Sequence, residues 1–154
     1  MNPNTDPAHE LVRFIRDKIP LARAMALELA AHDDHHLCLR VPLAPNVNDK
    51  GCAFGGSLTS VMTLAGWGLV ELALRARGEA CDVYVGESTV RYLQPVWADF
   101  SADAQLAEDA DWARFFATLA ARGKARIDVH CQVPGADDKP AAALTARFVA
   151  KRRD

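Results

Sequence analysis

The chain has 154 residues, of which 50% are hydrophobic and 25% charged, so it is long enough for one domain and too short for two ordinary ones. Its 18 basic and 20 acidic residues give a net charge of −2, which provides no global attraction to nucleic acid or to an anionic membrane. The four cysteines form no CxxC pair, and we recognise no signal peptide. We therefore expect a single domain over 1–154 in the cytoplasm, with reduced cysteines and without nucleic-acid or membrane partners.

The first predicted element is an amphipathic helix that begins at Pro7 with Asp6 as its cap and ends at Pro20. Two strands with alternating apolar residues follow, at 25–31 and 37–43, and a turn at 33–35 joins them into a hairpin. This turn region is rich in side chains of the metal-ligand type: His32, Asp33, Asp34, His35 and His36. A solvated turn explains them better than a metal site, so we predict no metal.

A loop at 44–53 leads into the longest helix candidate, at 55–77, which Gly78 ends. Its apolar residues point in nearly every direction, so we expect the rest of the fold to enclose it. The uncharged stretch 53–70 is not predicted to span a membrane, because a span needs about 20 mostly apolar residues and this stretch is rich in Gly, Ser and Thr.

The second half of the chain reads as an extended run at 82–94, a half-exposed strand at 98–106, a short amphipathic helix stopped by Gly123, and two alternating strands at 125–133 and 144–148. Pro134, Gly135 and Pro140 mark the turn between the last two. This order predicts an α+β fold in which a curved antiparallel sheet of about six strands wraps around one long central helix.

The start of the long helix is the strongest candidate for chemistry. Gly55 and Gly56 lie where free backbone N–H groups and the helix dipole favour a negatively charged oxygen, as in an oxyanion hole. The alternative is that both glycines only permit tight packing of the helix on the sheet.

Thr59, Ser60 and Thr63 form a polar stripe along the same helix, because residues three and four apart share a helix face. These hydroxyl groups either line a cleft beyond the glycines or bond back to carbonyl groups one turn earlier.

The pattern of Asn48, five residues, Phe54-Gly55-Gly56 and then Thr63 resembles the hotdog-fold acyl thioesterases. The wider stretch 46–67 is similar to the thioesterase domain found at the C-terminus of YiiD-type proteins, and 86–95 fits a Tyr-x-x-Pro that often follows the third strand of hotdog thioesterases. The resemblance implies a hotdog fold and hydrolysis of acyl thioesters of coenzyme A or acyl carrier protein, without a cofactor. It also implies a homodimer in which the third strands of two subunits pair, with tetramers left open.

In PaaI-like hotdog thioesterases, a loop Asn and a Gly amide usually face the thioester, and a carboxylate on the helix serves as base or nucleophile. Asn48 matches the Asn, and Gly55 and Gly56 match the glycine pair. Phe54 stands where those enzymes commonly have His, and Thr63 where they have Asp or Glu. The helix therefore cannot supply the usual carboxylate from that site.

Two other carboxylates could replace it. Glu87 follows Gly86 in an otherwise apolar strand, where partial desolvation would raise its pKa and suit it to activate water. Alternatively, Glu87 faces outward or pairs with Arg91. Asp49 is more typical of a residue that shapes its loop. We assign catalytic roles to Asn48, Gly55, Gly56, Thr63 and Glu87 and substrate-binding roles to Asp49, Phe54, Ser60 and Ser88.

Two weaker candidates remain. Cys52 lies beside the glycines, but no nearby His in the sequence would activate it as a nucleophile. The basic run at 151–153 either meets the phosphates of coenzyme A or is a solvated tail. The competing functions are a non-catalytic acyl-binding or carrier-docking module and, less favoured because Phe54 replaces the required His, a dehydratase or hydratase.

Overall fold

The computed structural model describes residues 6–154 as one sheet with four α-helices. The N-terminal half contains a helical pair, a hairpin, a 3-10 turn and a long helix: α1 (Pro7–Lys18), α2 (Pro20–Ala24), β1 (Glu28–His32), β2 (Leu37–Val41), Ala44–Asn46 and α3 (Gly55–Ala76). The second half contains β3 (Cys81–Tyr92), β4 (Phe100–Leu106), α4 (Trp112–Arg122), β5 (Lys124–Pro134), a 3-10 turn (Ala136–Asp138) and β6 (Pro140–Arg152).

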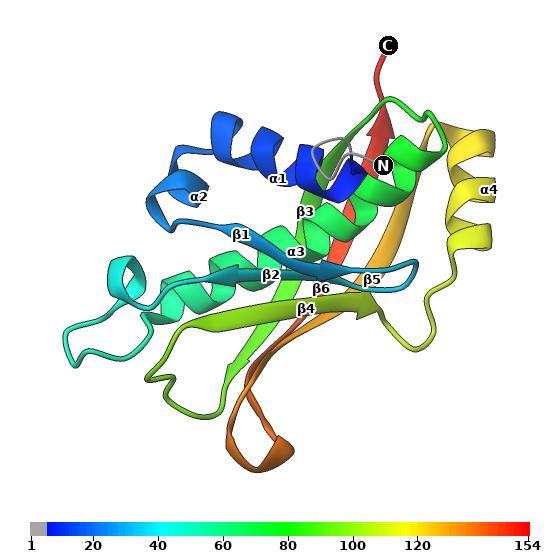
Figure 1. The fold of residues 1–154 in the computed structure, drawn as a ribbon. Helices are drawn as coiled ribbons and strands as arrows, with labels where there is room; N and C mark the ends of the chain where they lie inside the picture. Colours follow the sequence, from blue (N-terminus) through cyan, green and yellow to red (C-terminus); the bar gives the residue numbers. More distant parts are fainter. Residues whose placement is uncertain (1–5) are drawn as a thin grey trace.

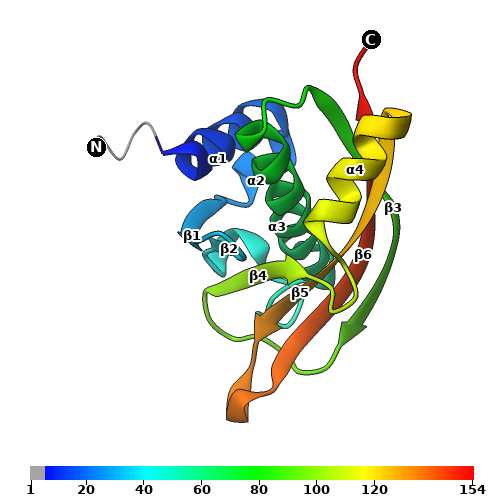
Figure 2. The same cartoon turned by 90° about the vertical axis from the view of Figure 1, so that its right-hand side faces the viewer.

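The sheet has six antiparallel strands in the order β1-β2-β4-β5-β6-β3. It curves around α3, which crosses its concave side, and α1 and α4 lie on either side of α3 (Figures 1 and 2). The predicted α+β layout, a curved six-stranded sheet around one long helix, is confirmed.

Close approach of α3 to the sheet depends on two glycines in the middle of the helix. A Cβ atom on Gly66 would lie 2.9 Å from the ring of Phe148, and one on Gly68 would lie 2.6 Å from a methyl group of Leu37. By length and mean hydropathy α3 would suffice to cross a membrane, but 56% of its most apolar window is buried inside the protein. It is therefore the core helix of the domain.

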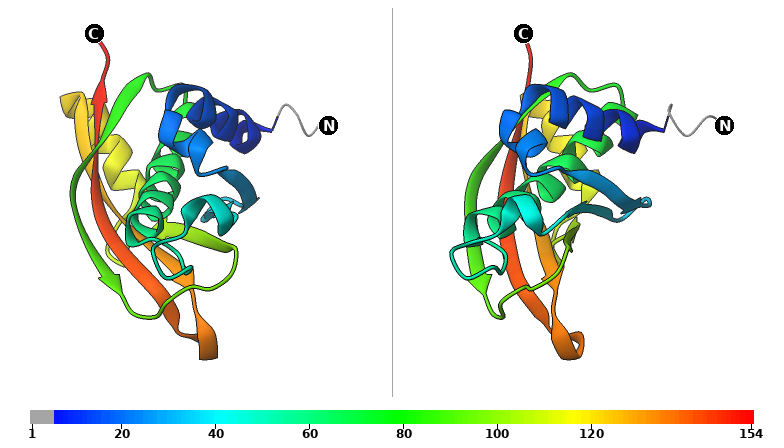
Figure 3. Two further views of the ribbon diagram at one scale, coloured as in Figure 1. Left: turned by 90° about the vertical axis from the view of Figure 1, so that its left-hand side faces the viewer. Right: turned by 60° about the vertical axis from the view of Figure 1, so that its left-hand side comes forward.

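β3 is an edge strand, because within residues 6–154 it pairs with β6 alone (Figure 3). Its register with β6 shifts between Val85 and Glu87, which leaves Gly86 as a bulge. A shift of one residue moves every following side chain to the other face of the sheet. Val85 therefore pairs with the buried Phe148, whereas Glu87 pairs with the outward-facing Arg147.

The N-terminal boundaries differ from the prediction. Pro20 ends α1 but also starts α2, so the first strand begins at Glu28 and not near Met25. Met25 and Leu27 are buried all the same, on either side of Ala26, whose φ of 58° marks a turn. The alternating apolar pattern at 25–27 therefore predicted the burial of these residues correctly but their strand structure wrongly. Residues of a turn can also alternate between buried and exposed.

Candidate active site

The first turn of α3 presents two free backbone donors. Ser57 and Leu58 donate their N–H groups to the carbonyl of Phe54, whereas the N–H groups of Gly55 and Gly56 have no acceptor within residues 6–154. Phe54, the N-cap residue, offers no side-chain cap. Unpaired N–H groups at the positive end of a 22-residue helix form a site for a negatively charged oxygen.

Close packing on the sheet does not explain these two glycines. A Cβ atom on Gly55 would be in ordinary contact with the ring of Tyr92 at 3.5 Å, and one on Gly56 would overlap only the exposed ring of Phe54. Tight helix–sheet contact is instead the role of Gly66 and Gly68. The structure therefore favours the interpretation of Gly55 and Gly56 as a point where a ligand can reach the main chain.

Tyr92, at the end of β3, lies beside the start of α3, and we call the place where these two elements meet the corner. Its hydroxyl lies 2.6 Å from the hydroxyl of Thr59, and its ring lies beside Gly55. One of the two hydroxyl groups donates to the other, so one O–H remains for a ligand. The sequence prediction included Tyr92 only as part of a motif, because the bulge that turns it toward α3 has no clear signature beyond Gly86.

The predicted polar stripe lies on the half-exposed side of α3. Thr59 bonds to Tyr92, and neither Ser60 nor Thr63 bonds back to the helix, so the self-capping alternative does not hold for these residues. Trp67 donates its indole N–H to the carbonyl of Val83 at 3.0 Å. Because Thr59 and Trp67 reach opposite ends of β3, Thr63 between them faces the middle of that strand.

The loop before α3 is shaped by Asn48. Its side-chain oxygen accepts from the N–H groups of Lys50 (2.8 Å) and Cys52 (3.2 Å), and its amide donates to the Cys52 sulfur at 3.2 Å. Asp49 is exposed, and the hydrogen-bonded ammonium of Lys50 lowers the pKa of its carboxyl. The loop-shaping role expected of Asp49 therefore falls to Asn48, which keeps one amide hydrogen for a ligand.

Asn46 is a residue that sequence reasoning missed. It is buried, and its side-chain amide donates to the main-chain carbonyls of Met25 (3.0 Å) and Pro42 (2.8 Å). Its main-chain carbonyl accepts from the N–H of Phe54 (2.8 Å), whereas its side-chain oxygen is buried without a partner among residues 6–154. It thereby ties the start of α3 to the β1–β2 layer. A buried Asn in a loop has no sequence signature that separates it from the exposed ones.

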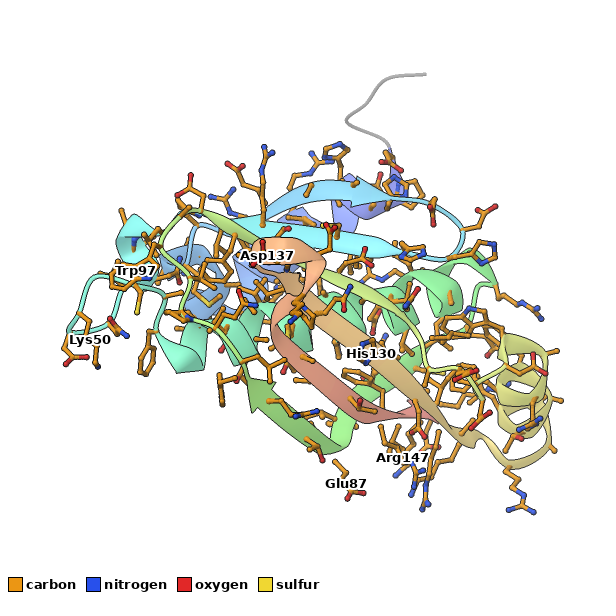
Figure 4. All side chains as sticks on the ribbon, turned by 90° about the horizontal axis from the view of Figure 1, so that it is seen from below. Lys50, Glu87, Trp97, His130, Asp137 and Arg147 are labelled. Carbon is orange, nitrogen blue, oxygen red and sulfur yellow. The ribbon has the colours of Figure 1, made fainter. Side chains whose placement is uncertain are left out.

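Of the two placements left open for Glu87, the structure confirms the outward-facing one and contradicts the desolvated one. The residue is exposed and points away from α3 on the outer face of the sheet, beside Arg147 (Figure 4). The guanidinium of Arg147 binds Asp128 at 2.9 Å. The cause is the bulge at Gly86, which sends Glu87 outward and turns Ser88, opposite Ala146, toward α3. Glu87 is therefore not desolvated and does not reach the start of α3 in its own subunit.

The three weaker candidates of the sequence also have defined places in the fold. Cys52 is buried and accepts a hydrogen bond from the side-chain amide of Asn48. All four cysteines are free, and burial raises the pKa of the Cys131 thiol to about 12. The basic run is no tail, because β6 extends to Arg152, which binds Glu79, while Arg153 binds Asp82 at 2.8 Å. The His-rich turn is organised by Asp33, whose pKa is lowered by the backbone N–H groups of His35 and His36.

A family model described as "Putative thioesterase (yiiD_Cterm)" matches residues 8–152. The chain belongs to this YiiD-type thioesterase family. It is also similar to a crystal structure of a protein of unknown function from Chlorobaculum tepidum, with 30% identity, a TM-score of 0.89, and coverage of 95% of this chain and 94% of that one.

Two further structures support the fold of this YiiD-type chain. A "putative thioesterase" from Shewanella oneidensis has 27% identity and a TM-score of 0.83, covering 94% of this chain and 97% of that one. The PaaI protein of E. coli has 15% identity and a TM-score of 0.64, covering 96% and 94%. The hotdog fold is thus confirmed, and the family supports thioester hydrolysis in general.

Proposed function

We propose that this YiiD-type protein hydrolyses an acyl thioester, carried by coenzyme A or acyl carrier protein, at the start of α3. The two free amides of Gly55 and Gly56 carry the proposal. They donate to the thioester carbonyl oxygen and stabilise the negative charge that grows on it as water attacks. The free hydroxyl of the Tyr92–Thr59 pair and the amide of Asn48 help to orient the same group.

Water is positioned by the polar stripe. Its oxygen, held by Thr63 and Ser60, adds to the carbonyl carbon. The carbon–sulfur bond then breaks, and the departing thiolate takes the proton lost by water to become the free thiol. Phe54 and Ser88 border the acyl group. No carboxylate of α3 lies near its N-terminus, and Glu87 faces away, so catalysis rests on positioning and oxyanion stabilisation.

The active form is a homodimer. The unpaired edge of β3 exposes apolar side chains, including Val85 (48%) and Tyr92 (58%), which favours pairing with a second β3. Antiparallel pairing about a two-fold axis places the Tyr92 end of one strand beside the Cys81 end of the other. Four free cysteines favour the cytoplasm.

Thiol release from acyl-coenzyme A and acyl carrier protein thioesters, over a range of chain lengths, tests the activity. We expect turnover with at least one of the two carriers. No turnover on either carrier at any chain length would overturn the proposal.

The missing helix carboxylate favours a second candidate, a module that binds acyl thioesters without cleaving them. Mass spectrometry of a bound acyl thioester separates the two functions. An intact thioester after hours of incubation would identify the binding module.

A further inference from the structure

The start of α3 lacks the side chain that usually marks the beginning of a helix. Phe54 is the N-cap residue, with an extended backbone (φ −66°, ψ 133°), and its ring accepts no hydrogen bond from the first turn. A Ser, Thr or Asp at this position normally holds the backbone outside the helix, because its side-chain oxygen accepts from an amide of the first turn. The extended backbone of Phe54 is therefore held by another contact.

The other helices of the chain show what a side-chain cap does to these amides. Asp6 accepts from the N–H of Ala8 (3.5 Å) at the start of α1, and Asp111 accepts from the N–H of Ala113 (2.8 Å) at the start of α4. Both donors are the second residue of their helix. The second residue of α3 is Gly56, so a capping Asp would take up one of its two free amides.

Asn46 provides the contact that holds Phe54. The main-chain carbonyl of Asn46 accepts from the N–H of Phe54 at 2.8 Å, while the carbonyl of Phe54 accepts from Ser57 (2.9 Å) and Leu58 (3.1 Å). Phe54 is thus fixed on both sides, by Asn46 before the helix and by the first turn after it. The N–H of Gly55 lies in the same planar peptide unit as the Phe54 carbonyl, so its direction is fixed as well.

The side chain of Asn46 fixes the position of its own main chain. It is 2% exposed, and both hydrogens of its amide are used, one by the carbonyl of Met25 (3.0 Å) and one by the carbonyl of Pro42 (2.8 Å). Its N–H donates to the carbonyl of Leu43 at 2.8 Å. Among short side chains only asparagine offers two donors, whereas Ser offers one and ionised Asp offers none.

The oxygen of the same side chain indicates that the two donors are the useful part of Asn46. This Oδ1 atom is buried and has no hydrogen-bond partner among residues 6–154. A buried acceptor without a partner is unfavourable for stability. Asparagine is therefore a poor choice for stability alone, and the contacts of its amide explain its presence at the base of the loop that leads into α3.

We propose that Asn46 is a positioning residue for the oxyanion donors. It holds Phe54 outside the helix from behind, so that α3 begins at Gly55 without a side-chain cap and the amides of Gly55 and Gly56 stay free and aligned. Asn46 itself does not touch the substrate. This role rests on the proposed function, since the oxyanion is that of the acyl thioester.

Kinetics of Asn46→Ala and Asn46→Ser test the role against a variant that is only destabilised. Leu119→Ala serves as that control, because it removes a buried side chain of α4, which packs on β5. We expect Asn46→Ala to lower kcat at least about 10-fold and to change KM less than about 2-fold, because the donors lose their alignment. Asn46→Ser keeps one donor and should lose less. Leu119→Ala should keep the wild-type kcat wherever it is folded.

Nuclear magnetic resonance tests the position of the amides without turnover. The chain has nine glycines, so glycine-selective ¹⁵N labelling gives a simple spectrum, and Gly55→Ala and Gly56→Ala assign the two signals. Both Asn46 variants should shift the signals of Gly55 and Gly56 and leave that of Gly78, beyond the other end of α3, in place. Leu119→Ala should leave the signals of Gly55 and Gly56 unchanged.

Unshifted signals of Gly55 and Gly56 in the Asn46 variants would overturn the role of Asn46. So would a folded Asn46→Ala with the wild-type kcat, or an equal loss of kcat in Leu119→Ala, since the loss would then follow stability. Asn46→Ser carries the same comparison if the alanine variant does not fold. A wild-type protein without turnover, in which the Asn46 variants still shift both signals, would contradict the proposed hydrolysis and leave the positioning of the amides intact.

Discussion

The hydroxyl oxygens of Thr59 and Tyr92 lie 2.6 Å apart, which joins the second turn of α3 to the last residue of β3. This contact fixes the ring of Tyr92 beside Gly55 and leaves one hydroxyl hydrogen next to the free helix amides. The corner formed by these residues is the centre of the proposed active site.

Tyr92→Phe is expected to lower kcat about 5-fold with little change in stability, because it removes one hydrogen bond worth about 1 kcal/mol at an exposed position. Steady-state kinetics and urea unfolding measure the two effects. Tyr84→Phe is the control, since Tyr84 is equally exposed at the other end of β3. Equal kcat values for the two variants would show that the Tyr92 hydroxyl has no role in the proposed active site.

Glu87→Gln is expected to change kcat/KM by less than about 2-fold and to leave its pH profile unaltered, because the side chain faces away from α3. Thr63→Val, on the helix face toward the middle of β3, should lower kcat. A pH limb that disappears in Glu87→Gln would show that the carboxylate does reach the reacting atoms.

Gly66→Ala is expected to destabilise the protein by about 1–3 kcal/mol, because its new methyl group would overlap the buried ring of Phe148. Gly56→Ala meets only the exposed ring of Phe54 and should cost less than about 1 kcal/mol, since alanine also favours helix. Urea unfolding of the two variants compares them. Similar losses would mean that helix packing is equally tight at both positions.

Val85→Asp is expected to shift the protein toward monomer, because it places a charge on the exposed apolar edge of β3. Leu21→Asp, at an apolar side chain of α2 that is 59% exposed, should leave the assembly unchanged. Sedimentation velocity reads out both. A wild-type protein that is a monomer, or a Val85→Asp variant that stays a dimer, would contradict pairing through β3.

Much of the fold follows from local pattern. The all-round apolar character of 55–77 requires an enclosed helix. The start of α1 is fixed by the capping side chain of Asp6 and by Pro7, and the end of α4 is fixed by Gly123 in the left-handed conformation. Each of these features depends on residues that are close together in the sequence. The enclosed helix and the two helix ends can therefore be predicted without the structure.

The candidate site is harder to predict from the sequence, because it depends on strand register and on contacts between residues far apart in the chain. The free amides of Gly55 and Gly56 could be predicted, since they belong to one helix start. The facing of Glu87 and Tyr92 could not, because the bulge at Gly86 reverses the alternation along β3. Asn46 escaped prediction for a related reason, since its partners Met25 and Pro42 come together only in the fold.

The comparison of Gly55→Pro with Gly55→Ala tests most directly whether the helix amides act on the thioester. Proline suits the first helical position, and the extended backbone of Phe54 (ψ 133°) accepts a following proline, so only the N–H should be lost. We predict that Gly55→Ala keeps its rate of acyl-thioester hydrolysis, whereas Gly55→Pro loses about 100-fold in kcat. Equal rates for the two variants, with both folded, would contradict the account.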